Sequence, residues 1–203
     1  MKKMILMAAI MLSSVSAFAQ NEVGQFTLQP KVGINFANLT GDGTKGKVGF
    51  VGGLEAEYGI AENFGLTLGA MYSMEGAKLD DVDAILNGVE VHGAKDNFNF
   101  AYLNVPVMLQ YYVVPGLAVK AGAQFGFRMS AKEKISKDGN SANINIKDGV
   151  EGFNFAIPVG ISYEYKNVVL DGRYIFGATK SFKNVEKNKT SLFQITLGYK
   201  FAL

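Results

Sequence analysis

Residues 153–165, FNFAIPVGISYEY, alternate strictly between two kinds of side chain. Every odd position, from Phe153 to Tyr165, is apolar or aromatic, and every even position is small or polar. A period of two over 13 residues predicts a β-strand with one apolar and one wet face. At about 3.3 Å per residue the strand is roughly 40 Å long, enough to cross a bilayer at a tilt. Aromatic side chains at both ends of its apolar face are typical of membrane-barrel girdles, so we predict a transmembrane strand.

The same alternation recurs along the chain and predicts an eight-stranded antiparallel up-and-down transmembrane β-barrel of the all-β class. The expected strands are residues 25–39, 47–60, 64–76, 97–113, 117–130, 153–165, 168–180 and 190–201. The connections alternate in length, as in bacterial barrels with short periplasmic turns and longer outer loops. The expected outer loops are about 40–46, 77–96, 131–150 and 181–189; Asn87-Gly88 and Gly139-Asn140 suggest a hairpin within two of them.

Residues 1–19 have the pattern of a secretory signal peptide. Lys2 and Lys3 give a basic start, residues 4–12 an apolar core, and Ala17-Phe18-Ala19 a cleavage site. We therefore expect export, an outer-membrane location and one mature domain over residues 20–203. The mature chain then carries 18 basic and 18 acidic residues, so its charge gives no indication of nucleic-acid binding.

Composition excludes several function classes. The chain has no cysteine, which excludes disulfides, thiol catalysis and cysteine-based metal sites. It has one histidine, His92, so a histidine-rich metal site would need other chains. No apolar run of 18 residues follows the signal segment, which argues against a helical membrane protein.

The wet faces of the expected strands carry five positive and five negative side chains. Eight strands enclose a lumen that side chains can fill, and unpaired charges there would be costly. Equal numbers of both signs therefore predict a paired plug, and we favour a closed barrel over a narrow diffusion pore. The expected network, structural or pore-lining, is Lys31, Glu55, Glu57, Glu75, Lys120, Arg128, Glu164, Asp171, Arg173 and Lys200.

Pro106 and Pro158 lie within expected strands, where a proline removes a ladder hydrogen bond. A β-bulge near each proline is the expected accommodation, and it would shift the neighbouring side chains to the other face.

Two segments support a resemblance to a known family. Residues 102–111, YLNVPVMLQY, resemble a strand motif of Bacteroidetes outer-membrane β-barrel proteins, which are called the porin family or PorT-like proteins. Residues 155–163 are similar in sequence to residues 102–111. Residues 197–201, LGYKF, resemble the terminal aromatic strand that the outer-membrane insertion machinery recognises, although Ala202-Leu203 follow here. The resemblance implies a barrel fold and assembly by that machinery. It supplies no catalytic residue.

No catalytic, cofactor-binding or metal-binding residue is predicted. His92 lies in an expected loop with Asp80, Asp81, Asp83 and Asp96, but no serine motif accompanies it for lipid hydrolysis. The aspartates lack the glycine and distal glutamate of a calcium loop. A soluble lipocalin-like barrel with reversed faces is disfavoured because its solvent face would be poor in lysine and glutamate.

We expect a non-enzymatic structural or surface-interaction protein whose outer loops meet an extracellular ligand. A narrow diffusion pore is the alternative, and a lipid-modifying outer-membrane enzyme is the third hypothesis. The expected partners are outer-membrane lipid and the insertion machinery, with no cofactor and no nucleic acid.

Overall fold

The computed structural model describes residues 23–39, 44–86, 89–137, 140–145, 151–179 and 190–203, without the side chains of 38–39, 44–45, 77–86, 89–98, 132–137, 140–145 and 190. The predicted signal segment lies outside these residues. The strands are β1 (Phe26–Leu39), β2 (Thr44–Ala61), β3 (Phe64–Leu86), β4 (Val89–Val114), β5 (Leu117–Lys137), β6 (Asn140–Asn145), β7 (Phe153–Tyr165), β8 (Val168–Gly177), β9 (Thr190–Tyr199) and β10 (Phe201–Ala202).

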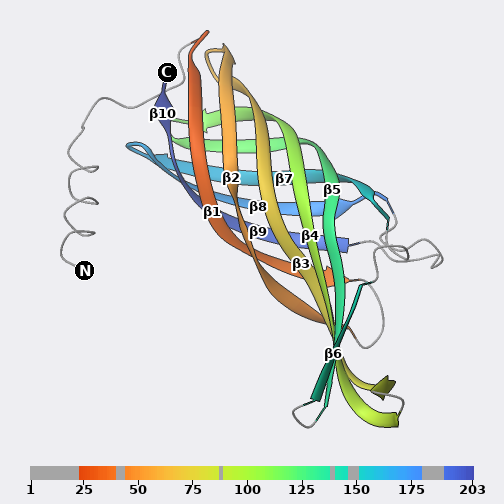
Figure 1. Ribbon diagram of the computed structural model, residues 1–203. Coiled ribbons are helices and arrows are strands. Elements are labelled where there is room, and N and C mark those ends of the chain that lie inside the picture. Colours follow the sequence, from red (N-terminus) through yellow and green to blue (C-terminus); the bar gives the residue numbers. More distant parts are fainter. Residues whose placement is uncertain (1–22, 40–43, 87–88, 138–139, 146–150, 180–189) are drawn as a thin grey trace.

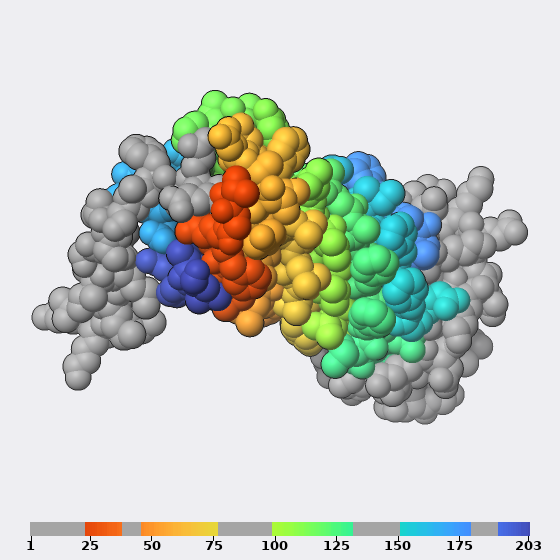
Figure 2. Space-filling model, turned by 90° about the horizontal axis from the view of Figure 1, so that it is seen from above, coloured from red at the N-terminus to blue at the C-terminus, as the bar shows by residue number. Residues whose placement is uncertain are grey.

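Antiparallel pairing joins the wall strands into a closed barrel (Figure 1). Neighbours follow chain order, and β1 closes the wall by pairing with β9, from Lys31 opposite Gly198 to Leu39 opposite Thr190. Figure 2 shows this closure as β1 (red) beside the last strands (blue). Strand β10 continues β9 past Lys200, and β6 pairs only with β5, so the wall has eight strands. The predicted fold class is confirmed.

The two ends of the barrel differ. At one end, tight turns at 62–63, 115–116 and 166–167 connect the strands, and β1 begins and β10 ends there (Figure 1). Gly116 has a φ of +83°, and a Cβ there would lie 2.5 Å from the Glu164 carbonyl oxygen, so this turn requires glycine. At the other end, β3, β4 and β5 extend beyond the wall and form, with β6, a protruding sheet (Figure 1).

Side-chain exposure follows the predicted alternation. Outward side chains such as Val32, Ile161 and Leu170 are more than half exposed, whereas inward ones such as Asn35 and Thr67 are buried. Outward aromatic rings contact one another at both ends of the wall. Near the turns, the ring centroids of Phe64 and Tyr111 are 4.9 Å apart, and those of Tyr199 and Phe201 are 4.7 Å apart. Toward the other end, the centroids of Phe127 and Phe153 are 5.7 Å apart, and those of Phe36 and Phe193 are 6.3 Å apart. An apolar outer surface with two aromatic belts is the surface that a bilayer requires.

Three strands, β3, β4 and β5, run at least seven residues further than the alternation predicted, because the polar segments next to them stay paired. The predicted loop 77–96 is largely ladder, because β3 and β4 pair up to Leu86 opposite Val89, on either side of the predicted hairpin turn. Asn87 and Gly88 themselves lie outside the described residues. Similarly, β5 and β6 pair up to Lys137 opposite Asn140. In contrast, the strand predicted for 168–180 ends at Gly177, beyond which Ala178 and Thr179 both donate to the Phe155 carbonyl oxygen.

The predicted bulges at the prolines are wrong. Pro106 pairs with Gln124 and Pro158 with Ile175, and the register is continuous through both positions. Across the other neighbour each proline faces a glycine, and a Cβ at Gly69 would lie 2.8 Å from the Pro106 ring. Small residues opposite the rings thus accommodate them without shifting the faces. The register instead shifts where β5 has one extra residue, Met129, between Arg128 and Ser130.

Among the described residues, no helix is long and apolar enough to cross a membrane.

Candidate functional site

The strand faces bring polar side chains from distant parts of the chain into the lumen, where they form three levels along the barrel axis. The level at mid-height, which we call the central cluster, consists of Lys31, Glu55, Lys120, Asp171 and Arg173. These side chains come from β1, β2, β5 and β8 and are at most 3% exposed. They therefore meet across the interior and not along one face.

Each carboxylate of the central cluster contacts all three cations. Glu55 lies 2.5 Å from Lys31, 3.5 Å from Lys120 and 2.5 Å from Arg173. Asp171 lies 3.2 Å from Lys31, 2.9 Å from Lys120 and 2.6 Å from the Arg173 Nε. Buried charges require such dense pairing, because isolation from water otherwise costs several kcal/mol per ion. The cluster carries one excess positive charge.

The level near the tight turns, the turn-end cluster, carries the opposite excess. Lys200 lies 2.5 Å from Glu164 and 3.2 Å from Glu57. Glu57 also accepts hydrogen bonds from three neutral side chains: Tyr112 at 2.7 Å, Gln110 at 2.8 Å and Gln29 at 3.0 Å. One cation faces two carboxylates here, so the two clusters together are neutral.

The third level lies at the outer end of the lumen and holds Glu75. Its Oε1 accepts hydrogen bonds from the Ser73 hydroxyl at 2.8 Å and from Asn104 Nδ2 at 3.2 Å, while Asn35 donates to Ser73 at 2.7 Å. Arg128 points inward from β5, where it pairs in register with Tyr102, and has interactions of its own. Among the described side chains, no ion pair joins Glu75 to a cation.

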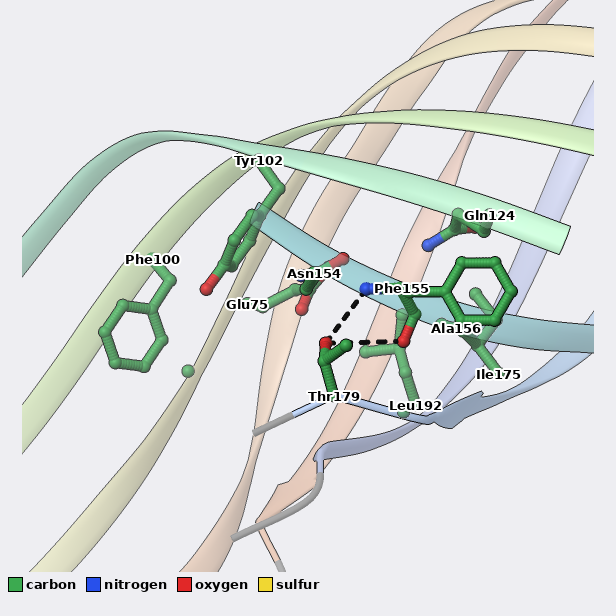
Figure 3. Close-up of a pocket in the computed structure, with 12 residues that line it drawn as sticks. Glu75, Phe100, Tyr102, Gln124, Asn154, Phe155, Ala156, Ile175, Thr179 and Leu192 are labelled. Atoms are coloured by element: carbon green, nitrogen blue, oxygen red, sulfur yellow. Dashed lines mark hydrogen bonds between the residues drawn. The ribbon is translucent and has the colours of Figure 1, made fainter. Parts of the chain in front are cut away.

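A cavity of about 40 Å³ lies beside Glu75 (Figure 3). Its polar wall includes Tyr102, Gln124 and Asn154, and its apolar wall comes from the cluster of Ala156, Ile175 and Leu192, which Ala37 completes. Thr179 closes one side by accepting from the Phe155 amide at 2.9 Å (Figure 3).

All ten charged residues singled out in the sequence are inward-facing, but they do not form one network. Eight fall into the two ion-paired clusters, whereas Glu75 and Arg128 lie at the outer level. The neutral partners Gln29, Gln110 and Tyr112 were not singled out. Their inward positions follow from the same alternation, but their contacts with Glu57 depend on which strands face each other across the lumen, which alternation does not encode.

The side chains of His92, Asp80, Asp81, Asp83 and Asp96 lie outside the described side chains. Within the described part of the chain, no group of three or more histidine, cysteine, aspartate or glutamate side chains is placed to hold a metal ion.

The comparisons with known proteins agree with this architecture. Over residues 18–183, most of the chain, the sequence matches the family described as outer membrane protein beta-barrel domain. The chain belongs to this family. It is therefore a small eight-stranded barrel of the outer membrane, in contact with lipid over its apolar wall.

Two solved barrels are similar to this family member. The crystal structure of Neisserial surface protein A aligns with a TM-score of 0.52 at 15% identity, covering 87% of this chain and 97% of that one. The crystal structure of Ail, the attachment invasion locus protein of Yersinia pestis, aligns with a TM-score of 0.49 at 17% identity, covering 89% of this chain and 100% of that one. At such identity the likeness to the Neisserial protein is one of fold. A search of curated proteins found no match.

Proposed function

We propose that this protein is a closed barrel with a structural or surface-interaction role, exercised through its outer end. The observation that carries the proposal is the contrast between a lumen crossed by buried ion pairs and an outer end that extends well past the wall. Charges locked in a paired cluster leave little room for a diffusion path. The protruding strands give a large surface beyond the membrane to which a partner can bind.

We infer that the protruding sheet has an edge that suits recognition. Among the described strands, β6 pairs with β5 alone, so the backbone N–H and C=O groups of its other side are not paired with any of these strands. An extended peptide can add to such an edge through main-chain hydrogen bonds. The outer loops at about 40–46, 77–96, 131–150 and 181–189 are the remaining candidate contact regions for an extracellular ligand.

Labelling of single cysteines tests which end of the barrel faces outward. The chain has no cysteine, so N140C at the start of β6 and E62C in a tight turn each give one reactive thiol. Treated with a membrane-impermeant maleimide, intact cells should label N140C and spare E62C, which should react only after the outer membrane is opened. The reverse pattern would contradict a surface role for the protruding sheet.

We also propose a route of export and a family origin for the chain. Residues 1–19 act as a cleaved signal peptide, and the terminal LGYKF segment delivers the chain to the outer-membrane insertion machinery. The motif at residues 102–111 supports membership of the Bacteroidetes porin or PorT-like group. Edman sequencing of the purified mature chain should begin at Gln20; a start at Met1 would contradict cleavage.

The proposed role is non-enzymatic. The described lumen contains carboxylates and amides that are largely paired. Around His92, the sequence has no motif that would place a serine nucleophile beside the histidine as a base. A H92A variant should therefore leave the phospholipid and lipopolysaccharide composition of the outer membrane unchanged.

A further inference from the structure

We propose that the cavity beside Glu75 is a binding site for a small organic ammonium ion, entered from the outer end of the barrel. Glu75 differs from the other lumen carboxylates of the described chain. Glu55, Glu57, Glu164 and Asp171 each have a lysine or arginine within 4 Å, whereas Glu75 is held by the neutral donors Ser73 and Asn104. Both bonds go to Oε1, and no described group donates to Oε2.

Two further oxygen acceptors near Glu75 lack donors. The Oδ1 atoms of Asn104 and Asn154 are buried without a hydrogen-bond partner, and Asn104 is only 2% exposed. Both oxygens converge over Gly126, where an added Cβ would lie 2.0 Å from Asn154 Oδ1 and 2.8 Å from Asn104 Oδ1. Buried polar atoms normally find partners, and Asn154, unlike Asn104, also lines the cavity, so its unpartnered oxygen indicates that a donor can bind there.

The chemistry of the missing group follows from the set of acceptors and the cavity walls. A primary ammonium group has one positive charge and N–H donors for the Glu75 carboxylate and the Asn154 amide oxygen, and both of these residues line the cavity. The opposite wall, formed by Ala156, Ile175 and Leu192, suits a short carbon chain, and the rings of Phe100 and Tyr102 can face a cation. A hydrated metal ion would gain little from such a wall.

The site lies where a ligand from outside can reach it. On three strands the cavity is lined by residues at or near the outer strand ends: Asn154 on β7, Gly177 on β8 and Leu192 on β9. About 40 Å³ is space for a few water molecules, enough for an ammonium group with one or two carbons while a longer chain extends outward. That the ligand comes from outside the cell rests on the proposed function, in which this end of the barrel faces outward. Binding at the cavity does not depend on this orientation.

Calorimetric titration of the detergent-refolded full chain tests the site. Butylammonium chloride should bind saturably at one site, whereas the anion butyrate, the neutral isostere butanol and the bulky tetrabutylammonium ion should not. The variant E75Q should weaken butylammonium binding at least tenfold, and the exposed turn variant E62Q should bind like the wild type. These titrations need no membrane orientation, so their outcome is independent of the cysteine labelling.

Several results would overturn the proposal. The proposal is wrong if butylammonium does not bind saturably, or if E75Q and the wild type bind it equally well. It is also wrong if butanol binds the wild type as tightly as butylammonium does, or if a calcium ion binds at Glu75 in place of the ammonium. The ligand comparison uses the wild type alone, so it decides the matter even if E75Q does not fold. Unboiled gel mobility checks the folding of each sample.

Discussion

Glu55 is the residue on which the charge balance of the lumen most depends. Its two carboxylate oxygens contact Lys31, Lys120 and Arg173, and it is fully buried. If it were neutralised, three cations would share Asp171 alone. Uncompensated buried charge is among the most destabilising changes a side chain can cause.

The variant E55Q should lower the free energy of unfolding by about 3–5 kcal/mol, because it removes one partner of a buried pair and leaves the cations behind. Urea titration of the refolded chain, followed by gel mobility, measures the difference. The control E62Q removes a carboxylate that is exposed in a tight turn, and it should change stability by less than about 0.5 kcal/mol. Similar stabilities for the two variants would contradict the structural role of the central cluster.

At the scale of the single residue, the sequence indicated which way each charge points, but not its partner. Period-two alternation places Lys31 and Asp171 on the wet face without reference to any other strand. Their 3.2 Å contact joins β1 to β8, although the two residues are 140 positions apart in the sequence. The contact therefore depends on how the barrel closes and how its strands are staggered. The same limit explains why Glu75 was counted in a balanced network although its contacts are neutral.

At the scale of the element, each wall strand separates an apolar lipid face from a polar lumen face. Strand β7 matches its predicted bounds, 153–165, because turn residues flank it on both sides. Strands β3, β4 and β5 were predicted too short because their outer parts mix charged and apolar residues without strict alternation, so the pattern ends although the pairing continues. The proline bulges were wrong because a facing glycine, which alternation does not reveal, gives each ring room.

Arginine substitutions on the lipid face should destabilise the barrel according to depth. Val159 lies midway along β7, whereas Val113 lies one residue from the turn end of β4, and both point outward. In phospholipid vesicles, V159R should lower the free energy of unfolding by about 2–4 kcal/mol, and V113R by at most about 1 kcal/mol. The reason is that a charge on the lipid face is most destabilising at the bilayer midplane. Denaturant titrations of both variants measure this. Equal losses would contradict the inferred position of the membrane.

At the scale of the whole molecule, the two ends and the interior have separate tasks. The tight-turn end carries the start of β1, the end of β10 and a compact cluster around Lys200, and the centre is filled by ion pairs. The outer end combines a cavity of about 40 Å³ beside Glu75 with a sheet that protrudes from the membrane. In the role that we propose, folding depends on the first two regions and recognition on the third.

The most direct test of a closed lumen is the ion conductance of the refolded mature chain in a planar bilayer. Unboiled gel mobility of the same preparation, and protection from protease in vesicles, establish that the barrel is folded and inserted. We predict no conductance steps above those of bare lipid, because the central cluster crosses the lumen with paired charges. Steady single-channel steps from the inserted wild-type barrel would contradict the closed lumen and identify the chain as a narrow pore.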